Sequence, residues 1–587
     1  MKKTESLRGR TASLRPGPGP SPLQKLLVID RLEVGPIRLD GDRLVAPYTV
    51  TQGERRDSTD FVYRFEEPVF DPLSPGSQNL AAVMAAQVAL NYGLFCREIV
   101  VRGLVDRHDR RFLLDMASNT AREIYVKKLL QPNPYLVRSF EPPPAVKLAD
   151  YLQARFRFPD GVEEIPAGPS ATEQRASDAG RGETSPGYAV LSSGGKESLL
   201  SFALLREIGG DPLRKIGGDP LREIGGDPLR KIGGDPRAVF INESGRHWFT
   251  ALNAYRHFKG SYPGTARVWT SADRVFSWML RHLPFIRQDF ARVRGDDYPI
   301  RLWTVAVLLF GAIPLMRARG LTRLVIGDEH DTTRRLSFKG ITHYDGLYDQ
   351  SRYFDHAMSR YFQRKGWDIL QFSLLRPLSE LLVEKILLER YPDLQRQQVS
   401  CHATHTEGDR VVPCGRCEKC RRVVGMLSAL GVDARRCGYT SEQIKDCLDH
   451  LTRVTLHQEA DCARHVRHLL AERGLLQGGP GALFEPCPEV LKLRFDPERS
   501  PMDTLPADLR RPLLRIFLEH ASGSVRRSGR IWIPFDPLND SEIERAPVTE
   551  SGTVTVAPSE TVTETVNETG AGIGYGYGHG SRHGTKS

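Results

Sequence analysis

A glycine-containing segment at residues 188–201 constrains the fold of this chain more than any other feature. It reads YAVLSSGGKESLLS, an apolar β-like run that breaks at two glycines and resumes as a helix-like pattern. Adjacent glycines let backbone amides approach a phosphate closely, and the N-terminus of the following helix adds its positive end. The pattern predicts a strand, a phosphate-binding turn and a helix. An ordinary glycine turn between a strand and a helix is the alternative interpretation.

The segment is not a Walker-type P-loop, and it resembles the ATP-pyrophosphatase loop instead. A P-loop needs a glycine five residues before Gly195 and a Ser or Thr after Lys196, but Val190 and Glu197 stand there. P-loops usually serve attack at the γ-phosphate, whereas the pyrophosphatase loop presents the α-phosphate and releases pyrophosphate. The expected intermediate is therefore an adenylate. The expected ATP-binding residues are Ser193, Gly194, Gly195, Lys196 and Ser198.

Four cysteines in the segment SCHATHTEGDRVVPCGRCEKC (400–420) predict a metal site. Two overlapping C-x-x-C steps and one cysteine upstream can supply the tetrahedral sulfur shell that Zn²⁺ prefers. Four protein ligands leave no open coordination position, so we expect a structural zinc. His402 or His405 could replace one thiolate, and buried free cysteines are the alternative. The expected ligands are Cys401, Cys414, Cys417 and Cys420.

Composition and charge limit the classes of partner. The 587 residues are 40% hydrophobic and 26% charged, which is typical of several globular domains. Half of the net charge of +10 lies in residues 1–25, so the basic balance is weak evidence for nucleic acid and we expect no such partner. The most apolar run, Leu302 to Met316, is shorter than the ~20 residues a bilayer requires and contains Pro314. We expect a buried helix there, no membrane partner, and a cytoplasmic protein with reduced thiols.

Composition also suggests the order of the domains. Disorder is expected in a basic tail (1–25) and in a Thr/Val/Glu-rich, then Gly/Tyr/His-rich tail (546–587). Between them we expect an N-terminal α+β domain (26–155), a linker (156–186), a nucleotide-binding domain (187–440) and a helical C-terminal region (441–545). The nucleotide-binding domain contains an eight-residue repeat array at 206–236 and the zinc element at 401–420. Gly-Gly-Asp-Pro in each repeat predicts an extended loop.

The segments from residue 188 onward predict an α/β fold with a doubly wound parallel sheet. The β-like runs YAVLSS, AVFINE, ARVWTS and RLVIGDE alternate with helical patterns. Ligands of such sheets bind beyond the carboxyl ends of the strands. That rule selects LTRLVIGDEHDTTRR (321–335), where a strand ends at Gly327 and delivers Asp328 to the same edge as the glycine loop. Carboxylates there can hold Mg²⁺ beside a triphosphate, although a solvated turn is the alternative.

Two further polar residues are candidates for catalysis. Arg376 precedes Pro377 at a predicted helix start, where Ser379 and Glu380 either strengthen an anion site or simply cap the helix. His343 is an acid–base candidate, but an isolated histidine is often structural.

Three blocks in order resemble the UDP-N-acetylmuramoyl-L-alanyl-L-glutamate epimerase family of bacterial cell-wall synthesis. They are SSGGKESLLSFALLRE, FSLLRPLSELLVEKIL and SCH followed by PCGRCEKCRRVVGML, and the resemblance covers roughly residues 60–440. The glycine loop and the four cysteines are also similar to those of the 7-cyano-7-deazaguanine synthases. The usual loop of the larger ATP-pyrophosphatase group is Ser-Gly-Gly-x-Asp-Ser, and Glu197 holds its acidic position here. Glutamate keeps the charge with one more methylene, which changes the metal geometry.

The resemblance implies an adenine-nucleotide α-hydrolase-like fold and an ATP-dependent epimerase of peptidoglycan precursor synthesis. Adenylation would neutralise the α-carboxylate of the terminal L-glutamate in a UDP-linked muramoyl dipeptide, so that a base could remove the neighbouring proton. In that account Glu197 and Asp328 support Mg²⁺, and Arg376 binds a substrate carboxylate. The proton-transfer bases stay unassigned, with His330, His343 and Tyr344 as candidates. The implied cofactors are ATP, Mg²⁺ and a structural Zn²⁺.

Two other functions remain open. The first is a deazaguanine synthase-like or tRNA-modifying enzyme that adenylates a different acceptor. The second is a zinc-stabilised scaffold without catalysis, suggested by Glu197, the repeats and the long tails.

Overall fold

The structure of the protein is a computed structural model. It describes residues 23–165, 187–209, 234–245, 247–293, 298–454, 456, 458–476, 484–541 and 543. The C-terminal tail, almost all of the N-terminal tail, and most of the linker and of the repeat array expected from the sequence lie outside these residues. Of the repeat array, residues 206–208 belong to the end of a helix.

Five parallel strands form the half of the central sheet that positions the site. They are β7 (Tyr188–Ser192), β8 (Arg237–Asn242), β9 (Ala266–Thr270), β10 (Arg323–Ile326) and β13 (Leu370–Ser373). Their order in the sheet is β13-β10-β7-β8-β9, and each neighbouring pair is parallel. Numbered along the chain and read from β9 to β13, the order is 3-2-1-4-5, which occurs in doubly wound sheets. The chain changes direction across the sheet between β7 and β10, so the loops after these two strands border the crevice.

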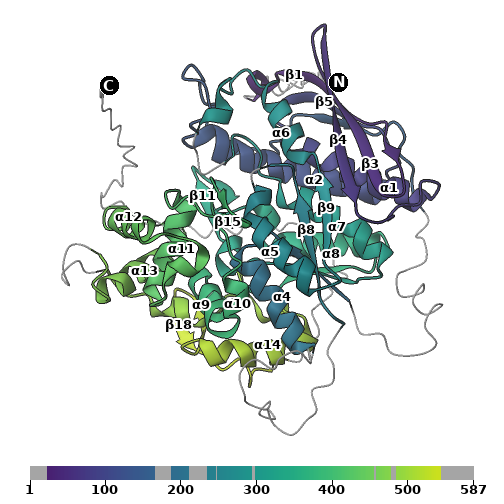
Figure 1. Cartoon of the computed structure of the whole chain (residues 1–587). Helices are drawn as coiled ribbons and strands as arrows, with labels where there is room; N and C mark the ends of the chain where they lie inside the picture. Colours follow the sequence, from purple (N-terminus) through teal and green to yellow (C-terminus); the bar gives the residue numbers. More distant parts are fainter. Residues whose placement is uncertain are drawn as a thin grey trace, which may run out of the picture. The chain divides into compact units, whose positions relative to one another are not determined.

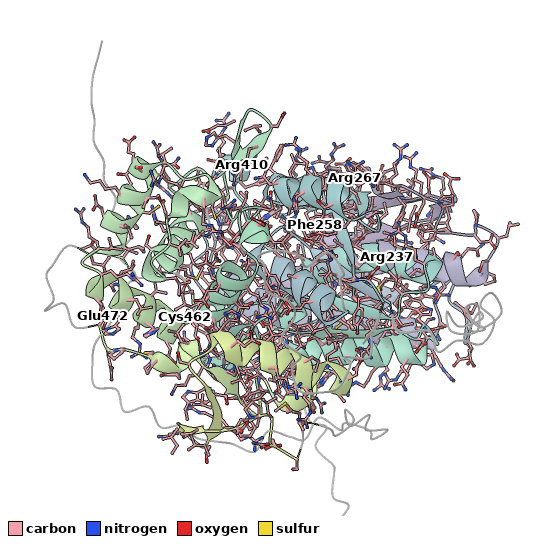
Figure 2. All side chains as sticks on the ribbon, turned by 60° about the horizontal axis from the view of Figure 1, so that its bottom comes forward. Arg237, Phe258, Arg267, Arg410, Cys462 and Glu472 are labelled. Carbon is pink, nitrogen blue, oxygen red and sulfur yellow. The ribbon has the colours of Figure 1, made fainter. Side chains whose placement is uncertain are left out.

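Helices cover both faces of the parallel strands (Figure 1). One core contains α4 (Lys196–Ile208), α5 (His247–Ser261), α9 (Glu380–Arg390) and α14 (Ala507–His520). Phe258 of α5 is fully buried in this core (Figure 2). The other core contains α6 (Ala272–Leu280), α7 (Val305–Ala318) and α8 (Arg352–Arg364). The prediction of a buried helix near 302–316 is therefore confirmed. No helix in the described ranges is both long and apolar enough to cross a bilayer.

The N-terminal region extends the same sheet instead of forming a sheet of its own. Its strands are β1 (Ile29–Val34), β2 (Arg38–Leu39), β3 (Arg43–Gln52), β4 (Arg55–Phe65), β5 (Cys96–Val101) and β6 (Arg155–Arg157). Strand β4 pairs with β9 in antiparallel register, which joins everything into one eleven-stranded sheet. Helices α1 (Pro75–Ala86) and α2 (Arg107–Ile124) share the core of α7 and α8. The expected boundary around 156–186 thus separates two segments of one sheet, because β4 covers an edge of β9 that would otherwise be exposed.

The C-terminal region contains the expected helices and, in addition, a small sheet. Its helices are α12 (Ser441–Leu451), α13 (Ala460–Glu472) and α14, and α11 (Glu418–Ala429) precedes the region at the cysteines. A three-stranded sheet of β16 (Leu493–Phe495), β17 (Ser524–Ser528) and β18 (Ile531–Pro534) accompanies these helices. These strands are short, and β18 is largely exposed, so they lack the apolar alternation that identifies a strand in a sequence.

Candidate active site at the sheet switch point

The glycine loop between β7 and α4 is packed tightly against the neighbouring helix. Gly194 has φ +75°, and a Cβ there would lie 2.8 Å from the Cα of Ala251 in α5. Only glycine fits this position without moving backbone. Gly195 is the N-cap of α4 and has no side chain to satisfy the helix's free N–H groups. The helix therefore begins with free donors at the edge of the sheet, as an anion-binding turn requires.

Three serines have different roles in this loop. The Ser198 hydroxyl donates to the Gly195 carbonyl at 3.0 Å and lies 3.1 Å from the hydroxyl of Ser192. Ser192 also accepts from the Gly194 N–H at 3.3 Å, so these two buried serines brace the turn. Ser193 is exposed, and its hydroxyl has no hydrogen-bond partner among the described residues. Ser193 is thus the loop serine whose hydroxyl is available to a ligand.

Lys196 lies in a buried group of alternating charges. Its ammonium pairs with Glu197 and with Glu380 at 2.8 Å, and the Arg422 guanidinium lies 3.5 Å from the same Glu380 oxygen. Burial alone would lower the pKa of Lys196, but the two carboxylates raise it, so the lysine stays charged. Burial would raise the pKa of Glu380, but Arg422 and Lys196 lower it to about 2. Glu380 was considered in the sequence only as part of a helix start, and Arg422 was missed.

Glu329 adds a third carboxylate to this group. Burial and the charge of Glu197 raise its pKa to about 7, although Lys196 lowers it in part. The loop that holds Glu329 contacts the first turn of α4, because a Cβ on Gly327 would lie 2.6 Å from the Cβ of Glu197. We call Lys196, Glu197, Glu329, Glu380 and Arg422 the switch-point cluster. Three carboxylates face two cations in it, and this excess of negative charge suits a divalent cation.

Asp328 points away from this cluster, contrary to the expected pairing with Glu197. Its carboxylate lies 3.5 Å from Arg376, and its backbone is held by the Ser373 hydroxyl. Burial raises the pKa of Asp328 well above its ordinary value, although Arg376 opposes the shift. Within this loop, Glu329 is the carboxylate that interacts with the glycine loop.

Arg376 is fully buried, and its guanidinium donates hydrogen bonds to acceptors of the protein itself. It binds Asp355 at 2.6 Å, the Thr332 hydroxyl at 2.7 Å and the Gln350 carbonyl at 2.9 Å. The residue was expected to bind a substrate carboxylate, but in this structure it holds the loop after β10 in place. Ser379 is the N-cap of α9 and accepts from the Leu382 N–H at 3.1 Å, which favours the capping interpretation.

The two histidine candidates lie in different surroundings. His343 is in β12 (Ile341–Tyr344), is buried, and has its Nδ1 3.0 Å from the Tyr344 carbonyl. Burial lowers its pKa, and the charges acting on it come from Lys127, Asp345 and Arg122 instead of the switch-point cluster. His330 directly follows Glu329 and is completely buried. His330 adjoins the cluster through the chain at Glu329, and the charges acting on it come from Arg494, Arg499 and Arg527.

The four cysteines converge as the sequence predicts. Their four Sγ atoms all lie within 4.8 Å of one another. The shorter separations are 3.4 Å (Cys417–Cys420) and 3.9 Å (Cys414–Cys420 and Cys401–Cys417). Zn–S bonds of ~2.3 Å in a tetrahedron place sulfurs about 3.8 Å apart. The cluster could therefore hold a metal ion such as zinc. No polar atom of His402 or His405 is needed to complete the set.

The cysteine element also determines the position of a charged residue of the site. Backbone N–H groups donate to the sulfurs, among them Cys414 to Cys401 at 3.2 Å, which is the usual second shell of thiolates. Cys420 is the third residue of α11, and Arg422 follows it on the same helix. A metal at the cysteines would therefore fix the end of α11 that brings Arg422 to Glu380.

Comparison with protein-family models, curated proteins and solved structures finds no match to this chain.

Proposed function

We propose that the protein is an ATP-dependent enzyme that adenylates a carboxylate and releases pyrophosphate and AMP. The observation that supports this most strongly is the switch-point cluster. A glycine turn, a helix N-terminus and a buried lysine lie at the crevice of a 3-2-1-4-5 half-sheet, where nucleotides bind in such folds. The turn lacks the residues of a γ-phosphate P-loop, which favours chemistry at the α-phosphate.

The residues present fit a triphosphate with a divalent cation. The free N–H groups of the first turn of α4, the ammonium of Lys196 and the hydroxyl of Ser193 would hold phosphate oxygens. Glu197 and Glu329 would hold Mg²⁺, which neutralises phosphate charge when bound. Glu329 replaces Asp328 in this role because the Asp328 carboxylate is directed to Arg376.

We further propose that the acceptor is the terminal glutamate α-carboxylate of UDP-N-acetylmuramoyl-L-alanyl-L-glutamate. A carboxylate oxygen attacks the α-phosphorus, the bond to the bridging oxygen breaks, and pyrophosphate leaves with that electron pair. The acyl group then has no negative charge beside the α-carbon, so its proton becomes acidic enough for an enzymatic base. Reprotonation from the other face and hydrolysis by water give the D-glutamate epimer and AMP.

The experiment is incubation of the full chain with ATP, Mg²⁺ and this dipeptide in deuterated water. The proposal predicts AMP, pyrophosphate and deuterium at the glutamate α-carbon. A deazapurine carboxylate or tRNA serves as the comparison acceptor. If ATP binds but AMP forms only with a comparison acceptor, the epimerase assignment is wrong while the adenylation is upheld. No AMP with any acceptor contradicts both and favours a scaffold.

A further inference from the structure

A second group of metal-ligating residues lies directly after Glu329. One ring nitrogen of His330 and one carboxylate oxygen each of Asp331 and Glu459 lie within 4.8 Å of one another. His330 is fully buried, and the side chains of Asp331 and Glu459 are 16% and 5% exposed. The three residues come from the loop after β10 and from the residue before α13, the helix that carries the labelled Cys462 and Glu472 in Figure 2. We call this group the His330 cluster.

The hydrogen bonds of Ser500 determine the tautomer of His330. The Ser500 hydroxyl donates its one hydrogen to the Arg494 carbonyl at 2.6 Å. Its oxygen must therefore accept from His330 Nδ1, which lies at 2.9 Å, and so Nδ1 bears the ring hydrogen. Nε2 is left with a lone pair. It is buried, and no hydrogen-bond partner for it exists among the described residues.

A buried imidazole lone pair without a partner costs free energy unless it binds something. Hydrogen bonding of the other ring nitrogen is also the arrangement of a metal-ligating histidine, whose second N–H is held by a neighbouring acceptor. Ser500 provides that acceptor here.

The carboxylates have capacity left for a cation. Arg494 binds both oxygens of Glu459 at 3.0 Å and one oxygen of Asp331 at 3.1 Å, and Arg499 lies 3.7 Å from Glu459. Arg494 contacts one oxygen of Asp331, and Asp331 and Glu459 also interact with each other. Each carboxylate oxygen has two lone pairs. The arginines hold the carboxylates in place without using all of their acceptor sites.

We propose that His330 Nε2, Asp331 and Glu459 bind a divalent transition cation, such as Mn²⁺ or Zn²⁺, at a second site distinct from the cysteines. One imidazole and two carboxylates suit these ions, whereas four thiolates select zinc. Three protein ligands leave positions open to water or to a substrate oxygen, as in catalytic metal sites. His330 directly follows Glu329 of the switch-point cluster in the chain. The proposed metal site does not depend on the proposed adenylation.

The test is titration of the full chain with Mn²⁺ alone, without nucleotide, followed by electron paramagnetic resonance of the free ion. Mn²⁺ prefers oxygen and nitrogen ligands to thiolates, so the titration does not report on the cysteine site. We expect a site that is lost in His330→Ala and whose Kd is raised roughly 10- to 100-fold in Ser500→Ala. Any Mn²⁺ bound by the carboxylates of the switch-point cluster should be unaffected by these two changes. His343→Ala is the matched control, since this histidine is also buried and hydrogen-bonded through Nδ1, and it should bind as the wild type does.

Folding of each variant is checked by thermal melting, and Asp331→Asn provides an independent second variant that keeps the side-chain volume. No bound Mn²⁺ in the wild type would overturn the proposal. So would equal binding in the wild type, His330→Ala and Asp331→Asn. Binding that survives both substitutions but disappears in Glu197→Gln would assign the ion to the glycine loop instead.

Discussion

Lys365 and Lys196 are buried lysines that each pair with two carboxylates, and they differ in what surrounds them. Lys365 pairs with Asp106 and lies 3.1 Å from Asp109. Asp106 caps α2 by accepting from the N–H groups of His108 and Asp109, and further side chains satisfy Asp109. Each of the three side chains is at most 4% exposed. We call this group closed, because its three charged side chains are buried and paired within the protein. It joins the N-terminal segment to the end of α8.

The Lys196 group is open where the Lys365 group is closed. The Glu197 side chain is 23% exposed, and the helix that contains it, α4, has a glycine as its N-cap. The third carboxylate, Glu329, has a raised pKa. The same pair of charges is therefore structural in one place and able to take a ligand in the other. The comparison teaches that unsatisfied donors and excess charge, and not burial of a lysine, identify a candidate site.

The largest expected effect comes from removing the open lysine. Lys196→Met should reduce AMP formation at least about 100-fold, because a preorganised cation facing the phosphates is lost. The free energy of unfolding should change less than in Lys365→Met, since Arg422 still pairs with Glu380. Initial rates of AMP release and urea unfolding curves measure the two quantities. A Lys196→Met enzyme with wild-type rates would remove the functional distinction between the lysines.

Removing the closed lysine should have the opposite profile. Lys365→Met leaves Asp106 and Asp109 buried without their cation and should destabilise the protein by about 3–5 kcal/mol. The folded fraction should keep its rate of AMP formation, because no residue of the switch-point cluster contacts this group. Denaturant unfolding monitored together with activity at low temperature checks both statements. Selective loss of activity at unchanged stability would contradict them.

The cysteine element should link stability to the open cluster. Cys417→Ser should abolish zinc binding, lower the melting temperature and reduce AMP formation about 10-fold, because α11 no longer fixes Arg422 beside Glu380. Elemental analysis, melting curves and rates measure the three effects. Cys96→Ala is the control, since this buried cysteine lies outside the cluster. Full activity in a zinc-free Cys417→Ser protein would show that Arg422 needs no metal for its position.

The smallest effect is a pH dependence of the open cluster. Glu329 has a pKa of about 7 in the folded chain and about 4.5 as its ordinary value. Between these values the folded chain keeps a proton that the unfolded chain has released, so the contribution of Glu329 to stability falls as the pH rises. Mg²⁺ favours the ionised form, so binding of Mg²⁺–ATP should strengthen a few-fold as the pH rises through 7. Glu329→Gln should flatten both profiles; unchanged profiles would exclude Glu329 as their source.

Sequence patterns located the elements whose signals are local. Spacing predicted the strand, glycine turn and helix at 188–208 and the convergence of the four cysteines. The apolar character of the run near 302–316 predicted a buried helix. The membership of β4 in the central sheet could not be predicted, because it depends on a pairing of Tyr63 with Thr270 that is distant in sequence.

Side-chain direction was the other limit of the sequence. Asp328 and Glu329 are adjacent and chemically alike, but Asp328 pairs with Arg376, whereas the charge of Glu197 acts on the pKa of Glu329. Arg422 was missed because its role depends on how the cysteines orient α11. The position of His343 away from the cluster likewise follows from a hairpin whose direction the sequence does not indicate.

The most direct test of the account is phosphorus NMR of ATP turnover with the dipeptide acceptor, because it identifies which phosphate bond breaks. The account predicts AMP and pyrophosphate from the wild type and from folded Lys365→Met, and no turnover from Lys196→Met. Formation of ADP and inorganic phosphate, or equal product from both lysine variants, would contradict the assignment of the switch-point cluster to chemistry at the α-phosphate.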